Sequence, residues 1–363
     1  MAQRVVLAGG GTAGHIEPAL AVAEALLLKD PRISCEFIGV LRGLESLLVP
    51  KRGHRIHYIP KASFPRRFSP KIILFPILII AATLKARVII KRADLVIGFG
   101  GYVSTPTYLA AWSLKVPILI HEANAKPGLA NRLGRRFAKV TAVNFEKVAK
   151  DWPGSVLVGM PIRQSLNNLA EQSNRSSFRE LNCQSWGFDP KLQIVAVFGG
   201  SLGSTHINSV IAEFLEKYCD RYTKVQIIHA LGINNELPGA SNNYLPLPYF
   251  HDMAAIYGSA DLLITRSGAV TCSELVSLGK YSILIPLPHG NGEQIDNATA
   301  LVAQGSALMV ANDDFSAEWL NQNLSIALDC AARYQPKSIG SNSKAAMRIA
   351  ELAQDLLSKA GAK

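Results

Sequence analysis

Cysteine is scarce in this 363-residue sequence: the five cysteines lie at positions 35, 183, 219, 272 and 330. Their number is odd, and their spacing matches no zinc-ligand pattern. The sequence also lacks an Asp-x-Asp motif, so we expect no metal site, and the scattered cysteines favour a reducing compartment. No apolar run reaches the roughly 20 residues that cross a bilayer. We expect no signal peptide, because Met1–Arg4 leads directly into a predicted strand.

Acidic residues are few: 27 Asp and Glu stand against 38 Lys and Arg, which gives a net charge of +11. This excess favours an acidic partner, such as a phosphorylated substrate, an anionic membrane or nucleic acid. We expect no nucleic acid, because the sequence shows no recognition motif and no interleaving of basic and aromatic residues. The length and the 48% hydrophobic content predict two or three domains with sizeable cores.

Three buried strands of the first half each run into a turn rich in glycine or polar residues and then into a helix. The turns are Gly9–His15, Phe99–Ser104 and His121–Asn124. The carboxyl ends of parallel strands meet at one edge of a sheet, where ligands bind, so we predict that these turns form one wall of a cleft. His15 has two interpretations here: it is a helix N-cap or packed ring, or it is a general base or substrate ligand.

The second half repeats this plan. Gly199–Ser204 follows a buried strand and opens a helix, which makes it a candidate phosphate cradle. Arg266–Gly268 follows another strand, and Glu274 lies on the helix behind it, ahead of Gln294 on the next helix. A helix N-terminus attracts phosphate, and a neighbouring carboxylate can hold sugar hydroxyls, so the pattern predicts a nucleotide-sugar pocket. The alternative is that Glu274 only compensates its helix dipole and Gln294 is a surface residue.

The chain is therefore predicted to be an α/β protein with two doubly wound, Rossmann-like halves. Gly9–Gly14 matches G-x-G-x-x-G, which leaves a dinucleotide-dependent oxidoreductase as a remote alternative. A dinucleotide-binding domain should have an acidic residue at the end of its second strand. Here the acidic residue, Glu36, lies early in Ser34–Gly39, which argues against that alternative.

A basic and apolar segment follows the third predicted strand. The run Ile72–Leu84 is apolar almost all round, which is typical of a core helix. With its flanking cations it also suits the surface of an anionic membrane, where each Lys or Arg contributes about 1 kcal/mol. The predicted membrane patch consists of Arg66, Arg67, Phe68, Lys71, Ile72, Phe75 and Ile79.

Motifs along almost the whole chain carry a family resemblance. They are Gly9–His15 with Pro18, Gly98–Tyr102, His121–Asn124 with Gly128, Asn131 and Arg132, Gly159–Arg163, Gly199–Gly203 with Asn208, Arg266–Glu274, Pro286–Pro288, and Gln294 with Asn297. The set resembles the bacterial undecaprenyldiphospho-muramoylpentapeptide β-N-acetylglucosaminyltransferases, which belong to glycosyltransferase family 28 and have the GT-B fold. Ala13, Ala123 and Leu202 depart from that pattern, because Gly, Gln and Gln are usual there.

The resemblance implies two facing domains with a cleft between them. The expected acceptor and membrane-associated domain is residues 1–161, and the expected UDP-sugar domain is residues 162–342. A helix at about 343–363 is expected to pack back on the acceptor domain. The implied reaction transfers N-acetylglucosamine, with inversion, from UDP-N-acetylglucosamine to the muramoyl 4-hydroxyl of lipid I. The products are lipid II and UDP, and the step serves peptidoglycan synthesis.

The implied partners are UDP-N-acetylglucosamine, lipid I and an anionic membrane, without a cofactor. The implied location is peripheral, at the cytoplasmic face of the cell (inner) membrane. Another GT-B transferase with a lipid acceptor, such as a diacylglycerol glycosyltransferase, remains the alternative.

The resemblance also implies roles for individual residues. His15 is the candidate base, and Glu122 is the alternative base or the partner that orients His15. The expected acceptor-side residues are Gly100, Gly101, Tyr102 and His121. The expected donor-binding residues are Thr12, Ala13, Gly14, Asn124, Arg163, Ser201, Phe250, Ala269, Val270, Thr271, Cys272, Ser273, Glu274 and Gln294. Among these, Glu274 is expected to hold the ribose, Phe250 the uracil through its backbone, and Arg163 the charge of departing UDP.

Overall fold

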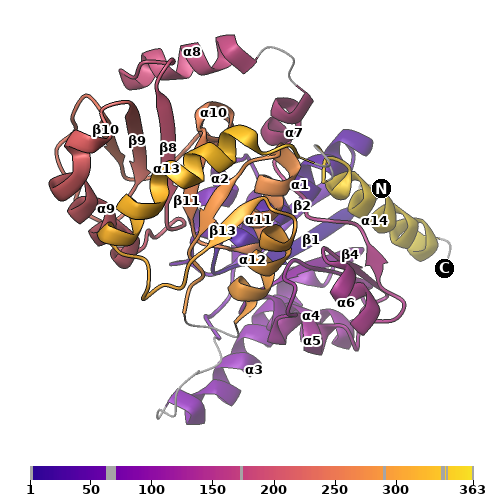
Figure 1. The fold of residues 1–363 in the computed structure, drawn as a ribbon. Coiled ribbons are helices and arrows are strands. Elements are labelled where there is room, and N and C mark those ends of the chain that lie inside the picture. Colours follow the sequence, from indigo (N-terminus) through magenta and orange to yellow (C-terminus); the bar gives the residue numbers. More distant parts are fainter. Residues whose placement is uncertain are drawn as a thin grey trace. The chain divides into compact units, whose positions relative to one another are not determined.

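The computed structural model describes residues 3–62, 71–171, 175–288, 292–336, 340 and 342–361. The chain divides into two compact units: Met1–Arg163 together with Asn342–Lys363, and Gln164–Ser341. Each unit is a parallel sheet with helices packed on it (Figure 1). The predicted α/β class with two doubly wound sheets is confirmed.

The first unit contains a seven-stranded sheet in the order β3-β2-β1-β4-β5-β6-β7, and all its neighbouring strands are parallel. Its strands are β1 (Arg4–Gly9), β2 (Ser34–Gly39), β3 (Arg55–Tyr58), β4 (Leu95–Gly100), β5 (Ile118–Glu122), β6 (Val140–Val143) and β7 (Val156–Leu157). The strand order reverses direction between β1 and β4. The chain leaves those two strands toward opposite faces, which opens a space at their carboxyl ends.

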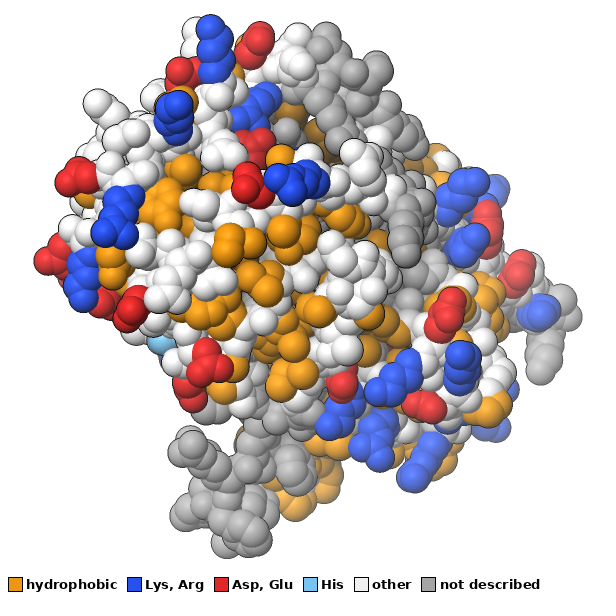
Figure 2. Space-filling model, in the orientation of Figure 1, with side chains coloured by type: hydrophobic (Ala, Val, Ile, Leu, Met, Phe, Trp, Pro, Cys, Tyr) orange, Lys and Arg blue, Asp and Glu red, His pale blue; other side chains and the backbone are white. Residues whose placement is uncertain are grey.

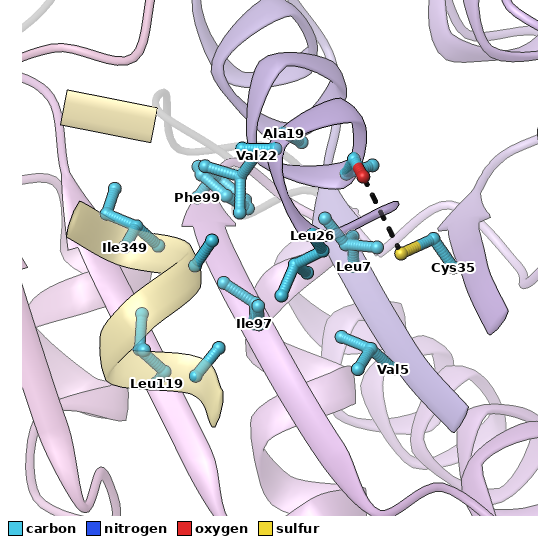
Figure 3. Packing of buried hydrophobic residues seen from close by; sticks show 14 of the residues in the cluster. Val5, Leu7, Ala19, Val22, Leu26, Cys35, Ile97, Phe99, Leu119 and Ile349 are labelled. Atoms are coloured by element: carbon cyan, nitrogen blue, oxygen red, sulfur yellow. Dashed lines mark hydrogen bonds between the residues drawn. The ribbon is translucent and has the colours of Figure 1, made fainter. Parts of the chain in front are cut away.

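Helices pack on both faces of this sheet. They are α1 (Ala13–Lys29), α2 (Glu45–Lys51), α3 (Lys71–Ile90), α4 (Ser104–Ser113), α5 (Leu129–Gly134), α6 (Glu146–Asp151) and α14 (Ala345–Gly361). On one face, α1 and α14 bury their apolar side chains against β1, β4 and β5, and Figure 3 shows Val22, Leu26 and Ile349 meeting Leu7 and Ile97 there. On the other face, α3 and α4 cover the sheet.

Helix α14 completes the first unit although it follows the second unit in the chain. Ile349, Ala350 and Ala353 are fully buried in the core that α1 forms with the sheet. Before α14 begins, the Asn342 Oδ1 atom accepts a hydrogen bond from the Met160 N–H at 3.2 Å. The first unit therefore consists of two segments of the chain.

Helix α3 turns one side to the protein and leaves the other uncovered. Ala82, Ala86 and Ile90 are fully buried against α4 and the sheet, and Ile79 packs beside them. Ile77 is 64% exposed and Val88 is 73% exposed. No helix in the described ranges is long and apolar enough to cross a membrane.

The membrane patch expected from the sequence is only partly covered by the described residues. Phe75 and Ile79 are half-buried. Arg66, Arg67 and Phe68 lie outside the described residues, as do the side chains of Lys71 and Ile72. The apolar side chains that α3 does expose are a different set: Leu74, Ile77, Leu78, Ile80, Leu84 and Val88.

The second unit contains a six-stranded parallel sheet in the order β10-β9-β8-β11-β12-β13. Its strands are β8 (Gln193–Phe198), β9 (Val225–Ala230), β10 (Tyr244–Leu247), β11 (Leu262–Thr265), β12 (Ser282–Leu284) and β13 (Ala307–Met309). Its helices are α7 (Gln164–Glu171), α8 (Arg175–Trp186), α9 (Thr205–Tyr218), the 3-10 turn η1 (Cys219–Arg221), α10 (Met253–Ser259), α11 (Ala269–Leu278), α12 (Glu293–Ala303) and α13 (Ala317–Arg333). The order matches that of the first six strands of the first sheet, so the strand order again reverses direction between the first strand, β8, and the fourth, β11.

Candidate active site

Two glycine turns of the first unit lie back to back at the carboxyl ends of β1 and β4. A Cβ atom on Gly101 would lie 2.2 Å from the Gly10 carbonyl oxygen, and Gly101 has φ +82°. Only glycine combines that backbone conformation with that approach. The two turns predicted to share a wall are therefore in direct contact.

The buried carboxylate of Glu45 ties these turns together. Its Oε2 atom accepts a hydrogen bond from the Gly11 N–H at 3.1 Å. Its Oε1 atom accepts from the Val40 N–H at 3.0 Å and from the Tyr102 hydroxyl at 3.2 Å. The Glu45 residue is fully buried. Because its three donors follow β1, β2 and β4, one side chain sets the spacing of three loops.

His15 lies in the first turn of α1, and the N-cap of that helix is Thr12 rather than His15. The Thr12 hydroxyl oxygen lies 3.2 Å from the His15 Nδ1 atom. A Cβ atom on Gly100 would lie 3.1 Å from the His15 ring and 3.4 Å from the Asn131 amide nitrogen. The ring is half-buried, so the imidazole stands at the edge of the glycine turns with part of its surface exposed.

Glu122 ends β5 and is engaged by its own loop. Its Oε1 atom accepts hydrogen bonds from the backbone and side-chain nitrogens of Asn124, at 2.9 and 3.3 Å. Its Oε2 atom accepts from the Gly128 N–H at 3.1 Å and from the Asn131 amide at 3.0 Å. Burial raises the pKa of Glu122, and these donors oppose that rise. The carboxylate holds the turn between β5 and α5 in shape.

His121 is fully buried beside Glu122. Its Nε2 atom lies 2.9 Å from the Gly159 carbonyl oxygen, and because a carbonyl only accepts, Nε2 carries the proton. Burial lowers the pKa of His121 to about 4. The ring is a neutral link between β5 and the turn at Gly159, and its burial leaves no surface for an acceptor to contact.

Arg163, expected to meet the leaving UDP, belongs to the first unit. Its Nε atom lies 3.1 Å from the buried Glu17 carboxylate, which Arg52 approaches at 3.5 Å. The Arg163 side chain is 13% exposed. The structure therefore gives this cation an ionic partner within its own unit.

The glycine turn of the second unit is held by Arg266. This turn, Gly199–Ser204, leads into α9, and the Ser204 hydroxyl oxygen caps that helix by accepting from the Ile207 N–H. The Arg266 Nη2 atom donates to the Ser204 hydroxyl at 2.7 Å, and Nη1 donates to the carbonyls of Ile285 and Pro286. The carboxyl ends of β8, β11 and β12 are thus connected through one guanidinium.

The expected donor residues gather around α11. Ala269, Val270 and Thr271 form its first turn, whose N–H groups have no partner within a helix. Cys272, Ser273 and Glu274 are buried farther along the helix. The Glu274 Oε2 atom accepts a hydrogen bond from the Tyr257 hydroxyl at 2.8 Å, which fixes the carboxylate in place.

The start of α12 is bonded to the turn that precedes α11. The Ser267 hydroxyl donates to the Gln294 carbonyl at 2.8 Å, and the Asn297 amide donates to the Ser267 carbonyl at 3.3 Å. The Gln294 side-chain oxygen accepts from the Leu287 N–H at 3.0 Å. Phe250 is buried edge-on against Phe198, so only its backbone is available to contact the uracil ring of the donor. The turns of β11 and β12 form one hydrogen-bonded group.

The structure separates the predicted site residues into two sets. The first unit contains Thr12, Ala13, Gly14, His15, Gly100, Gly101, Tyr102, His121, Glu122, Asn124 and Arg163. The second unit holds Ser201, Phe250, Ala269–Glu274 and Gln294. Within the described ranges, His, Cys, Asp and Glu side chains form no group of three or more that is placed to hold a metal ion.

Sequence reasoning missed Glu45 and underrated Arg266. Glu45 stands in the first turn of α2, where an acidic residue normally compensates the helix dipole, so its burial leaves no local signal. Arg266 directly follows the apolar strand β11 and sits among small turn residues. A cation in that position is costly to bury without acceptors, and this was the available signal.

Comparisons with known proteins match both units. Residues 5–143 match the N-terminal domain of glycosyltransferase family 28, and residues 194–355 match its C-terminal domain. The chain is 43% identical over 319 residues to the UDP-N-acetylglucosamine–N-acetylmuramyl-(pentapeptide) pyrophosphoryl-undecaprenol N-acetylglucosamine transferase of Corynebacterium glutamicum, covering 87% of each chain. It is 39% identical over 356 residues to the protein of that name from Corynebacterium diphtheriae, covering 98% of this chain and 96% of the relative. The crystal structure of Acinetobacter baumannii MurG superposes with a TM-score of 0.69 at 27% identity, covering 97% of this chain and 99% of that one.

Proposed function

The chain belongs to glycosyltransferase family 28, and we infer that it transfers N-acetylglucosamine from UDP-N-acetylglucosamine to lipid I. The acceptor is the muramoyl sugar of the undecaprenyl-diphospho-muramoylpentapeptide, and the products are lipid II and UDP. The observation that carries this function is the 39% identity, over 98% of this chain, to a transferase named for those substrates. Peptidoglycan synthesis is the process that the reaction serves.

The second unit is the proposed donor site. The first N–H groups of α11 and the turn Gly199–Ser204 supply donors for the diphosphate, because helix N-termini and glycine turns favour anions. Tyr257 orients Glu274, whose carboxylate then accepts hydrogen bonds from the two ribose hydroxyls. Arg266 keeps the two turns at a constant spacing without contacting the nucleotide itself.

The first unit is the proposed acceptor site, and His15 is the proposed base. In the tautomer whose Nδ1–H donates to the Thr12 hydroxyl, Nε2 is the unprotonated ring nitrogen and takes the proton of the attacking sugar hydroxyl. The new bond forms from that oxygen to the anomeric carbon as the bond to UDP breaks on the opposite face, which inverts the anomeric centre. Glu122, expected from the sequence to be the alternative base or the partner that orients His15, is instead proposed to shape its own loop, because its hydrogen bonds already engage both oxygens.

Peripheral attachment to the cytoplasmic face of the cell membrane is also proposed. Its support is the uncovered side of α3, where Leu74, Ile77, Leu84 and Val88 are exposed. Burying such side chains at the boundary between lipid headgroups and acyl chains is favourable at about 25 cal/mol per Å².

Liposome sedimentation tests this attachment. Ile77→Asp is expected to release the protein from anionic vesicles. Leu181→Asp in α8, at 67% exposure against 64% for Ile77, is the matched control and is expected to bind as the wild type does. Equal binding of the two variants would remove α3 from the attachment surface.

The transferase itself is tested by UDP release from UDP-N-acetylglucosamine. Release that requires a short-chain lipid I analogue is the expected result. Release with a diacylglycerol acceptor in place of the muramoyl analogue would instead assign the chain to lipid glycosylation. If neither acceptor causes UDP release, both functions are contradicted.

A further inference from the structure

The phosphate turn, Gly199–Ser204, interlocks with the turn that follows β9. A Cβ atom on Gly203 would collide with the Leu231 carbonyl oxygen. A Cβ atom on Gly232 would likewise collide with the Leu202 carbonyl oxygen. Gly203 has φ +76° and Gly232 has φ +109°, so both positions need glycine for their conformation as well. Each carbonyl therefore occupies the space in which the other turn would carry a side chain.

The amide of Asn235 binds both of these carbonyls. Its Nδ2 atom donates to the Leu231 carbonyl at 2.8 Å and to the Leu202 carbonyl at 3.3 Å. The Asn235 N–H donates to the Gly232 carbonyl at 3.1 Å, which holds this side chain over the contact. From α9, the Asn208 amide donates to the same Leu231 carbonyl at 2.9 Å. The two turns are thus fastened together where they touch.

A buried histidine fixes the orientation of the Asn208 amide. Because Asn208 Nδ2 donates to a carbonyl, its Oδ1 atom faces the His229 Nε2 atom, at 3.2 Å, and can only accept. Nε2 therefore carries the ring proton, and Nδ1 accepts from the Tyr244 hydroxyl at 3.1 Å. Burial lowers the pKa of His229 to about 4, so the ring is neutral at neutral pH and keeps both roles. Hydrogen bonds thus run in series from β10 to the carbonyl that meets the phosphate turn.

The fastened turn presents backbone donors at its tip. The Gly203 N–H donates to the Gly200 carbonyl at 3.0 Å, which closes a β-turn with Ser201 and Leu202 at its centre. The Leu202 carbonyl and the Gly203 N–H belong to one planar peptide group, so the hold on that carbonyl also fixes the closing bond. Within the described part of the chain, the N–H groups of Ser201 and Leu202 donate to no backbone carbonyl.

The charge of the second unit makes the placement of these N–H groups important. Residues 164–341 contain 16 Asp and Glu against 10 Lys and Arg, a net charge of −6. The basic excess of the chain lies in the first unit, where Figure 2 shows Lys and Arg gathered over α4, α5 and α6. The net charge of the second unit repels a diphosphate, so attraction has to come from oriented N–H groups at short range. Binding should therefore be sensitive to small displacements of the turn.

We propose that Asn235, Asn208 and His229 are positioning residues that hold the phosphate turn in the conformation that binds the donor diphosphate. They act through the Leu202 and Leu231 carbonyls rather than by contact with the nucleotide. Donors that are already in place need no reorganisation when the anion binds. The role rests on the proposed donor site and concerns the diphosphate alone, so uracil and ribose binding should not depend on these residues.

The test compares a ligand that has the diphosphate with one that lacks it. Asn235→Ala removes the donor shared by the two carbonyls, and Asn235 is exposed, so folding should be unaffected. We expect UDP to bind roughly three- to tenfold more weakly, because one neutral hydrogen-bonding group is lost. Uridine should bind with unchanged affinity. Both affinities are measured as inhibition constants against UDP-N-acetylglucosamine.

A matched control makes the same chemical change elsewhere in the second unit. The Asn323 amide donates to the Trp319 carbonyl at 2.8 Å within α13. Asn323→Ala should therefore bind UDP and uridine as the wild type does.

Tyr244→Phe tests the buried part of the series. It removes the hydroxyl that His229 Nδ1 accepts from, so the ring can take its proton on Nδ1 and withdraw the donor from Asn208. We expect weaker UDP binding with unchanged uridine binding. Nitrogen NMR of the histidine ring should show the Nε2–H tautomer in the wild type and a different tautomer balance in the variant. An Nδ1–H tautomer in the wild type would overturn the role of His229.

The possible outcomes separate this role from the proposed function. UDP affinity of Asn235→Ala equal to wild type would overturn the proposal, and so would an equal loss of UDP and uridine affinity, which indicates a general structural role. Neither result would affect transfer by the wild type. A wild type that neither binds UDP nor releases it from the donor would instead contradict the proposed function, and the positioning role with it.

Discussion

Replacing Glu45 by glutamine should damage acceptor use while sparing the donor site. The carboxylate accepts from the Gly11 N–H, the Val40 N–H and the Tyr102 hydroxyl. An amide of the same shape has only one acceptor oxygen. That oxygen is expected to stay with Val40 and Tyr102, because two donors converge there. The NH₂ group of the variant then faces the Gly11 N–H, and the glycine turn loses its anchor.

The magnitude follows from that one contact. A hydrogen bond to a charged group contributes roughly 1.5–3 kcal/mol, and 1.4 kcal/mol corresponds to a factor of ten. We therefore expect Glu45→Gln to lower kcat/KM for the acceptor by roughly 10- to 100-fold. The affinity for UDP should not change, because the groups proposed to bind the diphosphate and the ribose, in the turn Gly199–Ser204 and in α11, belong to Gln164–Ser341.

The assay is UDP release with varied acceptor at saturating donor, together with calorimetric titration of UDP. Glu24→Gln is the matched control, because Glu24 in α1 forms only a partly exposed ion pair with Arg52 at 2.6 Å. Such pairs contribute about 0–1 kcal/mol, so this variant should act almost as the wild type does. If Glu45→Gln lowers the free energy of unfolding but leaves acceptor kcat/KM within twofold of wild type, the carboxylate does not position the site. An equal loss of UDP affinity would also refute the reasoning.

Three other predictions concern single side chains. Glu274→Gln should raise the donor KM by roughly 10- to 100-fold, because the charge-assisted hydrogen bond to the ribose is lost. Tyr257→Phe removes only the supporting bond at 2.8 Å and should raise the donor KM less. Unchanged donor kinetics in Glu274→Gln would exclude the ribose role. His15→Ala should lower kcat by roughly 10²- to 10⁴-fold with little change in donor affinity, and near-normal turnover would place the base elsewhere. The pKa of His121 is lowered from 6.5 to about 4 in the fold, so its neutral form stabilises the protein above pH 6.5 and this contribution is lost as the pH falls toward 4. The loss should reach roughly 3 kcal/mol, at about 1.4 kcal/mol per pH unit, and urea unfolding of His121→Gln should show a smaller decrease between pH 7 and 4.5 than the wild type.

The sheet edges were predictable because local signals agree there. A buried apolar strand followed by glycine and then a helix start fixes both the element types and the direction of the chain. This pattern recurs after β1, β4, β8 and β11, so the positions of Gly9–His15 and Arg266–Glu274 followed directly. The helix predicted at about 343–363 also carries an apolar stripe that needs a partner, although the pattern does not say which core receives it.

The side-chain partners were not predictable, because they join residues far apart in the chain. Glu45 accepts hydrogen bonds from three separate loops. Arg163 pairs with Glu17, although β2 to β7 lie between them in the sequence. The exposed side of α3 was missed for another reason. Its apolar residues surround the helix, so only the small Ala82 and Ala86, which pack closely against α4, distinguish the inner side from the outer one.

The position of α14 has a consequence for biosynthesis. The ribosome completes β1 to β7 first, but the apolar surface that α1 and the sheet offer to Ile349 and Ala353 must wait until Gln164–Ser341 has been made. At roughly 5–20 residues per second, that delay lasts on the order of 10 to 40 seconds. During this interval the nascent first unit presents an incomplete core, which is the kind of surface that chaperones bind. The earliest unit to be translated is thus the last to be finished.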